Sequence, residues 1–260
     1  MEEYYHRLVC LILVGQEWCF AVDVEPLHAG EDEVAAAKRL LDRVVAAYPR
    51  AFEVVGGDGL YARADFFNHV KGLGKEAFAV LNDEQRDLLQ DARALWATQP
   101  PVVRDAAEMR REVWDLSGFK TWPQCRHPVR VIRSRETRRV RRQLDKQTHE
   151  EVTEWVWVTT LTEMQAPTAA AVQIGHSRWT IENQGFNELV HRWHADHVYR
   201  HQPTAILVLW LFALLALNLF AAFYRRNLKP IVRQVWNALH ISRVIRAELL
   251  LGLPPNPSGP

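Results

Sequence analysis

The sequence has 260 residues, 48% hydrophobic and 24% charged, which is typical of a globular chain long enough to bury a substantial core. Lys+Arg 32 against Asp+Glu 31 leaves a formal net charge of +1, so overall charge does not point to nucleic acid. Cys10, Cys19 and Cys125 form neither a disulfide framework nor a C-x-x-C zinc motif, and the acidic start Met1-Glu2-Glu3 argues against a signal peptide.

Two β-rich runs begin the chain. Residues 6–14 and 18–26 flank Gly15-Gln16-Glu17 and are predicted to form a β-hairpin. Residues 31–48 are predicted to follow as a helix with one apolar face. That face consists of Val34, Ala37, Leu41, Val44 and Val45.

Asp58 closes the next apolar run. Residues 51–57 are predicted to be a strand, and Asp58 follows it directly, in front of Gly59. A carboxylate at the carboxyl end of a strand lies where open α/β sheets bind their ligands. Asp-Gly after a strand is also ordinary turn chemistry, so this position alone leaves both interpretations open.

The chain then continues as alternating helix and strand. Residues 64–70 are predicted to be a helix, 76–81 a short strand and 84–96 an amphipathic helix. Pro100-Pro101 marks the next boundary. The first 98 residues therefore indicate an α/β fold.

Between residues 102 and 162 the apolar period changes to two, which predicts antiparallel strands. The segment is too long for a loop, so residues 99–166 are predicted to be a β-rich insertion. It concentrates positive charge suited to phosphate contacts, although a solvated charged ribbon is the alternative. The candidate arginines are Arg130, Arg133, Arg135, Arg138, Arg139, Arg141 and Arg142.

A second carboxylate follows far downstream. The run Arg178-Trp179-Thr180-Ile181-Glu182-Asn183 is predicted to open a helix, and a helical wheel sets Glu182 between Leu189 and Trp193 in the apolar stripe. A carboxylate that faces the core must be compensated. Either Arg178 pairs with it without any chemistry, or it shares a divalent cation with Asp58.

These motifs together carry a resemblance to a known family. In order they are Glu25-Pro26-Leu27-His28-Ala29-Gly30-Glu31-Asp32-Glu33, Asp58-Gly59-Leu60-Tyr61 and Arg178-Trp179-Thr180-Ile181-Glu182-Asn183. The chain resembles bacterial insertion-sequence transposases of the DDE type over about residues 4–230. The resemblance implies an RNase H-like α/β fold: a mixed sheet with flanking helices and a β-rich insertion. It also implies that two aspartates and one glutamate hold two Mg²⁺ or Mn²⁺ ions.

By that match Asp58 corresponds to the second aspartate and Glu182 to the glutamate, and both are predicted catalytic residues and metal ligands. Arg178 corresponds to the arginine of the family's Tyr-Arg-Glu-Lys signature and is predicted to bind DNA, together with the arginines of the insertion. Gly175 stands in place of the signature tyrosine, and Leu189 in place of its lysine.

No residue matches the first aspartate, which in an RNase H-like sheet lies on a strand before the hairpin. Asp23 is the acidic alternative at a strand position, but it lies in the second arm of the hairpin with Glu25 on the same face. We therefore expect the first strand to be missing. The chain is then an N-terminally truncated member, or one read from an internal Met, and inactive by itself.

Residues 204–223 are apolar over a bilayer-spanning length and are followed by Tyr224-Arg225-Arg226, as a membrane anchor would be. Asn218 inside the run favours instead a buried helix packed on the sheet. A nearby histidine set has spacing conceivable for zinc, but a polar helix flank is the preferred interpretation. The set consists of His191, His194, His197 and His201.

The sequence therefore predicts a catalytic domain in two parts, residues 1–98 and a helical part 167–250, around the insertion 99–166, with a disordered tail 251–260. It predicts a cytoplasmic, nucleoid-associated transposase that acts on double-stranded DNA at transposon ends and target, as a homo-oligomer when active, without membrane association. The alternatives are a non-catalytic DNA-binding remnant and a single-span membrane protein anchored through residues 204–223.

Overall fold

The structure is a computed structural model that describes residues 7–15, 19–81, 86–106, 109–141, 148–181, 189–190 and 202–252. The chain divides into two compact units. The first comprises Met1–Val9 with Leu27–Trp179, and the second comprises Cys10–Pro26 with Thr180–Pro260.

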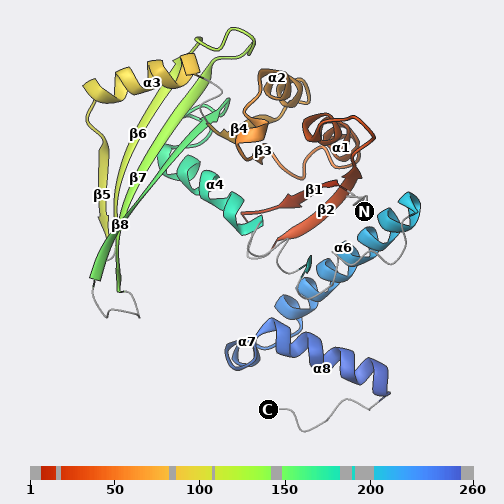
Figure 1. The fold of residues 1–260 in the computed structure, drawn as a ribbon. Coiled ribbons are helices and arrows are strands. Elements are labelled where there is room, and N and C mark those ends of the chain that lie inside the picture. Colours follow the sequence, from red (N-terminus) through yellow and green to blue (C-terminus); the bar gives the residue numbers. More distant parts are fainter. Residues whose placement is uncertain are drawn as a thin grey trace, which may run out of the picture. The chain divides into compact units, whose positions relative to one another are not determined.

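The first unit contains a sheet of six described strands in the order β3-β4-β8-β7-β6-β5 (Figure 1). β3 and β4 are parallel, and the other neighbouring pairs are antiparallel. The strands are β3 (Val54–Gly57), β4 (Glu76–Val80), β5 (Val102–Ala106), β6 (Met109–Phe119), β7 (Val129–Arg141) and β8 (Thr148–Thr159). This mixed sheet with its flanking helices confirms the predicted fold class.

The first unit has four described α-helices, α1 (Glu33–Ala47), α2 (Ala64–Gly72), α3 (Arg86–Thr98) and α4 (Thr168–Thr180). Of these, α1, α2 and α3 follow the predicted pattern closely, and α4 begins earlier than predicted. Asp32 caps α1 by accepting a hydrogen bond from the Ala35 N–H at 2.8 Å. The predicted apolar face of this helix is buried except for Val45, which is half-buried. In β4, Ala77, Phe78 and Ala79 are all buried, so both faces of this strand are covered.

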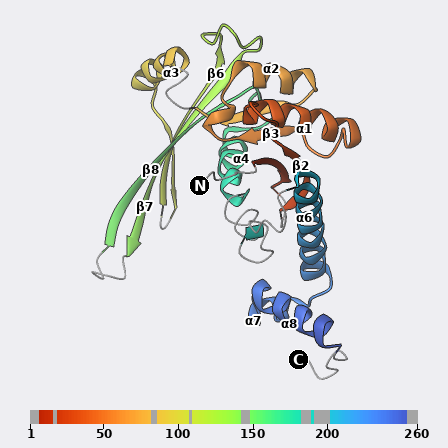
Figure 2. The ribbon, with the colours of Figure 1, turned by 45° about the vertical axis from the view of Figure 1, so that its right-hand side comes forward.

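The strands of the predicted insertion continue the same sheet. β8 pairs with β4 through Phe78↔Thr159 and Val80↔Trp157, and β7 and β6 follow outward. We call β5 to β8 the arm. Figure 2 shows β7 and β8 extending as a long ribbon away from β3 and β4. The arm is therefore built onto the sheet, so residues 99–166 do not form a separate layer.

β1 (Leu8–Leu13), most of which belongs to the second unit, and β2 (Phe20–Pro26) pair as a two-stranded sheet, as the hairpin prediction requires. The described helices of the second unit are α6 (Pro203–Arg226), α7 (Pro230–Val235) and α8 (Ala238–Leu251). α8 extends one residue into the predicted tail and ends at Gly252, whose φ of 60° is left-handed. The rest of that tail, residues 253–260, lies outside the described part of the chain.

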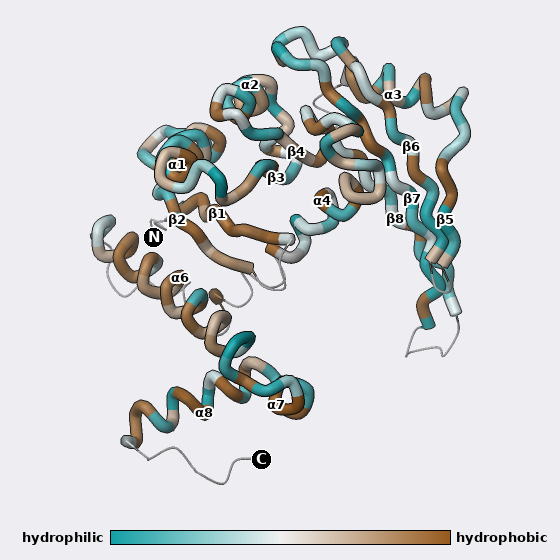
Figure 3. Tube along the Cα trace, turned by 180° about the vertical axis from the view of Figure 1, so that it is seen from behind, coloured by the Kyte–Doolittle hydropathy of each residue, from teal (hydrophilic) through white to brown (hydrophobic). Residues whose placement is uncertain are grey.

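The predicted helix over residues 204–223 is present as α6, and Figure 3 shows its apolar character along most of its length. Asn218, the polar residue inside this apolar run, has partners on β2. The Asn218 side chain accepts from the Ala21 N–H at 3.0 Å and donates to the Ala21 C=O at 2.6 Å. α6 therefore packs on β2. The prediction of a buried helix is wrong, because only Ile206, Leu214 and Leu217 are buried and many of the other apolar side chains are exposed. Among the described residues it is also the one helix long and apolar enough to cross a membrane.

Candidate functional site

Asp58 lies at the carboxyl end of β3, at the edge of the sheet where the parallel strand β4 also ends. Its Oδ1 accepts a hydrogen bond from the Leu60 N–H at 2.9 Å and caps the short helix η1 (Gly59–Tyr61). The side chain is exposed, and its Oδ2 has no hydrogen-bond partner among the described residues. Asp58 can therefore offer an oxygen to a cation at this edge.

Tyr61 fixes the turn that carries Asp58. A Cβ at Gly57 would meet the Tyr61 side chain at 2.6–2.8 Å, so this side chain lies directly on the last residue of β3. The Tyr61 hydroxyl donates to Glu33 Oε1 at 2.8 Å, at the start of α1. Burial, followed by this hydrogen bond, raises the pKa of Tyr61 well above its ordinary value, so the hydroxyl remains a donor. Sequence reasoning missed this residue.

Glu182 lies outside the described residues, as do the predicted histidine set and Arg142. The predicted approach of the Asp58 and Glu182 carboxylates stays a prediction. Within the described part of the chain, no group of three or more His, Cys, Asp or Glu side chains could hold a metal ion. Asp23 lies half-buried on β2, where its Oδ1 accepts from the Val24 N–H at 2.8 Å.

Arg178 lies in the last described turn of α4, which already begins at Thr168. The prediction that residues 178–183 open a helix is therefore wrong. Pro167 directly precedes α4, and its carbonyl accepts a hydrogen bond from the Ala171 N–H at 3.0 Å, so this proline marks the start of the helix. The Arg178 guanidinium lies over the Trp179 ring, 5.4 Å from its centre.

A buried carboxylate that sequence reasoning missed lies on β7. Glu136 is 2% exposed, and His176 Nε2 on α4 lies 2.6 Å from its Oε1. Arg111 donates to it at 3.0 Å and Arg138 at 3.3 Å. Burial opposes ionisation, but these neighbours outweigh it and lower the pKa of Glu136 from 4.5 to about 2. The group is an anion at neutral pH.

Gly175, which departs from the family signature, has a structural explanation. A Cβ there would meet the indole ring of Trp157 at 2.5–2.8 Å. Trp157 is 1% exposed, so the ring has no room to withdraw. Leu189, which departs at the lysine position, is 0% exposed and serves the core.

Two arginines of the predicted DNA-binding set are committed to the fold. The Arg130 side chain is 2% exposed; its Nε donates to Asp115 at 2.7 Å and its Nη1 to the Ala166 carbonyl at 2.8 Å. Arg133 binds Glu154 through two nitrogens, at 3.0 and 2.8 Å. Its guanidinium also lies over two tryptophan rings, Trp96 and Trp114. The alternating strand pattern could not reveal these partners, which come from other elements.

The other described arginines of the set lie further out along the arm. The side chains of Arg135, Arg138 and Arg139 are 48%, 58% and 73% exposed. Arg141 is also exposed. A hollow of about 540 Å³ on the arm is lined by Arg135 and Arg139, and acidic side chains line it too. Its acidic members are Asp105, Glu112 and Glu150. The arm therefore presents arginines within a mixed-charge surface.

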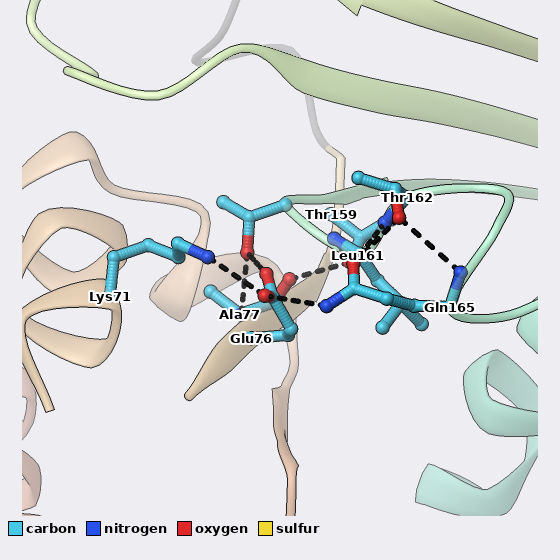
Figure 4. A network of polar contacts seen from close by, with 8 residues as sticks. Lys71, Glu76, Ala77, Thr159, Leu161, Thr162 and Gln165 are labelled. Carbon is cyan, nitrogen blue, oxygen red and sulfur yellow. Dashed lines mark hydrogen bonds and ion pairs between the residues drawn. The ribbon is translucent and has the colours of Figure 1, made fainter. Parts of the chain in front are cut away.

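A polar network joins the arm to the strand beside β3 (Figure 4). Glu76, the first residue of β4, accepts from Lys71 at 2.7 Å, Thr160 at 2.6 Å and Gln165 at 3.1 Å. Burial opposes ionisation of Glu76, but these hydrogen bonds outweigh it and lower its pKa. The Thr159 hydroxyl donates to the Ala77 carbonyl at 2.6 Å. These hydrogen bonds hold the end of β8 and the segment that leads to α4 against β4.

Comparison with known proteins identifies a family for the chain. The family model described as "Transposase DDE domain" matches residues 4–219. No curated protein matches the chain. The match covers most of the sequence and includes β3 with Asp58, the whole arm and α4 with Arg178. The chain therefore belongs to the DDE-type transposase family, whose RNase H-like fold its mixed α/β architecture fits.

Proposed function

We propose that this chain carries the DNA-handling surface of a transposase and two of its catalytic carboxylates, Asp58 and Glu182. The observation that carries the proposal is the position of Asp58 in a member of this family. Its exposed carboxylate follows a parallel strand and keeps one oxygen without a partner among the described residues. Open α/β sheets bind ligands at such an edge.

In this proposal Asp58 and Glu182 hold Mg²⁺ or Mn²⁺, and Arg178 contacts a DNA phosphate or orients Glu182. When bound, two such ions activate water or a 3′-hydroxyl and stabilise the leaving oxygen during in-line attack on a phosphodiester. The chain's own contribution is to hold the Asp58 carboxylate through the Leu60 N–H and the packed Tyr61 ring. Carboxylate oxygens are the ligands that such hard cations prefer.

The arm supplies the phosphate contacts through Arg135, Arg138, Arg139 and Arg141, and Arg142 completes the proposed set. Arg139 lies 3.4 Å from Glu150, and Arg135 lies 4.0 Å from Glu112. Exposed pairs of this kind contribute about 0–1 kcal/mol, so a DNA phosphate can compete for these guanidinium groups.

The proposed location is the cytoplasm, on the nucleoid, with a homo-oligomer as the active form. The Asn218 side chain engages the Ala21 backbone, which supports a helix docked on its own protein over a membrane anchor. The family motifs recognised in the sequence supply two of the three expected carboxylates, those of Asp58 and Glu182. With one carboxylate fewer, divalent affinity falls, so residues 1–260 alone are proposed to bind DNA without cutting it.

A strand-cleavage assay tests the catalytic half of the proposal. Purified residues 1–260 are incubated with supercoiled plasmid in Mg²⁺ or Mn²⁺, beside Asp58→Ala and Glu182→Ala as matched controls. We expect neither nicking nor joining in any sample. Metal-dependent nicking that disappears in both variants would show a complete ligand set, and Asp23→Ala then becomes the next variant. Nicking that persists in both variants would contradict their assignment.

A further inference from the structure

Helix α4 packs on an arm strand that carries a charge in its buried row. Alternate residues of β7 face α4, namely Ile132, Ser134 and Glu136, at 0%, 0% and 2% exposed. Ile132 belongs to the cluster that includes Ala171 and Val172 of α4. Glu136 extends that row, so its carboxylate occupies a position where an apolar side chain would suffice for packing.

The charge of Glu136 is costly and is fully matched. His176, Arg111 and Arg138 contact its oxygens, and the Ser134 hydroxyl donates to Oε1 at 3.3 Å. Replacing a buried ionic group by an apolar one is often neutral or stabilising. The benefit of the arrangement is therefore in orientation: an ion pair fixes geometry that apolar contacts leave free.

The contacts of α4 fix its rotation about its own axis. Trp155 and Trp157 of β8 are stacked, with ring centres 6.2 Å apart. Gly175 and Trp179, four residues apart on one helix face, meet Trp157 and Trp155 respectively. The His176 ring stands edge-on to both tryptophans, at 5.9 and 5.3 Å.

These contacts set the position of Arg178. It follows His176 by two residues, and its guanidinium lies over the ring of Trp179 that the arm holds. We propose that Glu136 and His176 are positioning residues, which hold α4 on the arm so that Arg178 meets the same DNA as the arm arginines. This inference rests on the proposed function, because it assigns DNA contacts to Arg178 and to the arm.

A double-mutant cycle in DNA affinity tests the proposal. Fluorescence anisotropy with a labelled duplex, at fixed salt, gives Kd for the full chain, Arg178→Ala, Glu136→Gln and the double variant. Arg178→Ala is expected to raise Kd about tenfold in the parent chain, as for one lost phosphate contact. In the Glu136→Gln background the same change is expected to raise Kd less than about twofold, because Arg178 is already displaced.

Arg139→Gln is the matched control for the cycle. Its exposed side chain lies on the arm outside the α4 contacts, so its loss should raise Kd by the same factor in both backgrounds. His176→Gln, which keeps a donor for Glu136, should preserve the Arg178 effect, and His176→Leu should abolish it. Equal effects of Arg178→Ala in the parent and Glu136→Gln backgrounds would overturn the proposal. So would an Arg178→Ala variant that binds like the parent.

Hydrogen exchange distinguishes failure of the positioning role of Glu136 and His176 from failure of the proposed function. Exchange of the amides of α4 should accelerate in Glu136→Gln and His176→Leu while α1 stays protected as in the parent. If the chain bound no DNA, the proposed function would fail, and unchanged α4 protection would overturn the positioning role independently. Should Glu136→Gln fail to fold, the variants His176→Gln and His176→Leu provide both measurements, the DNA affinity and the exchange of the α4 amides.

Discussion

Glu136 is an interior charge, and its surroundings set how the stability of the protein depends on pH. Its pKa lies at about 2, below the ordinary 4.5, because His176 and two arginines stabilise the ionised form against the burial penalty. A carboxyl whose folded pKa is depressed stabilises the protein above its unfolded pKa, and that contribution is lost as pH falls towards the folded value. The loss therefore falls between pH 4.5 and about 2.

We predict that the free energy of unfolding of the parent chain falls more steeply across that pH window than that of Glu136→Gln. The variant lacks the titrating group, so the difference between the two proteins should shrink as the solution becomes more acidic. Urea titrations at a series of pH values measure it. Parallel curves for the two proteins would show that Glu136 is not a stabilised anion.

The Asp58 turn depends on the absence of a side chain at Gly57. Gly57→Ala puts a Cβ within 2.6–2.8 Å of the Tyr61 side chain, so we expect a loss of about 1–3 kcal/mol in unfolding free energy. Gly72→Ala is the matched control, since a Cβ there meets nothing within 4 Å and a helix gains from alanine. Chemical denaturation compares them. Equal stability of the two variants would refute the Tyr61 packing.

At the scale of elements, the periodicity of the sequence predicts most helices and strands of the described chain. α1, α2, β3 and β4 follow predicted runs because each has one apolar pattern and a clear stop, such as Asp58 after β3. α4 differs from its prediction because the helix begins directly after Pro167, ten residues before the signature arginine Arg178. The local apolar pattern predicts that a helix or strand is present, whereas the residue at which a helix starts depends on the residues that cap it.

Partners across elements are harder to predict than the elements themselves. Arginines occur on both faces of β7, so alternation does not tell which of them is inside. Arg130 is buried where Asp115 of β6 compensates its charge in an ion pair, and Glu136 is buried where α4 covers it. The burial of Arg130 depends on how β6 and β7 align, and the burial of Glu136 depends on a helix far along the chain. The local sequence pattern of β7 predicts neither.

α6 gives a test that separates a docked helix from a membrane anchor. Asn218→Leu removes both hydrogen bonds to Ala21 and leaves its N–H and C=O without that partner. We expect a loss of about 1–3 kcal/mol in unfolding free energy, the cost of unpaired buried polar groups. An anchor would instead gain from losing a polar residue. Increased association of Asn218→Leu with liposomes in flotation, without loss of stability, would favour the membrane alternative.

For the whole molecule, the family and fold follow from motif order and from the alternation of helix and strand, which the family match confirms. The candidate site is less predictable. Asp58 is exposed at a strand end as expected, but Glu182 lies outside the described residues, and Tyr61, Glu136 and His176 act through contacts between distant segments. Such contacts arise only once the sheet has formed.

The arm is proposed to bind the DNA backbone, and the salt dependence of duplex affinity is the most direct test of that binding. Each phosphate contact lowers the slope of log K against log salt by about 0.9, so the parent should lose affinity steeply as salt rises. Arg135→Gln with Arg139→Gln should flatten that slope by about two contacts, whereas Arg133→Gln, whose guanidinium is held by Glu154 and two tryptophans, should leave it unchanged. A chain whose DNA affinity is negligible, or whose slope is the same in the arm variant, would contradict the account.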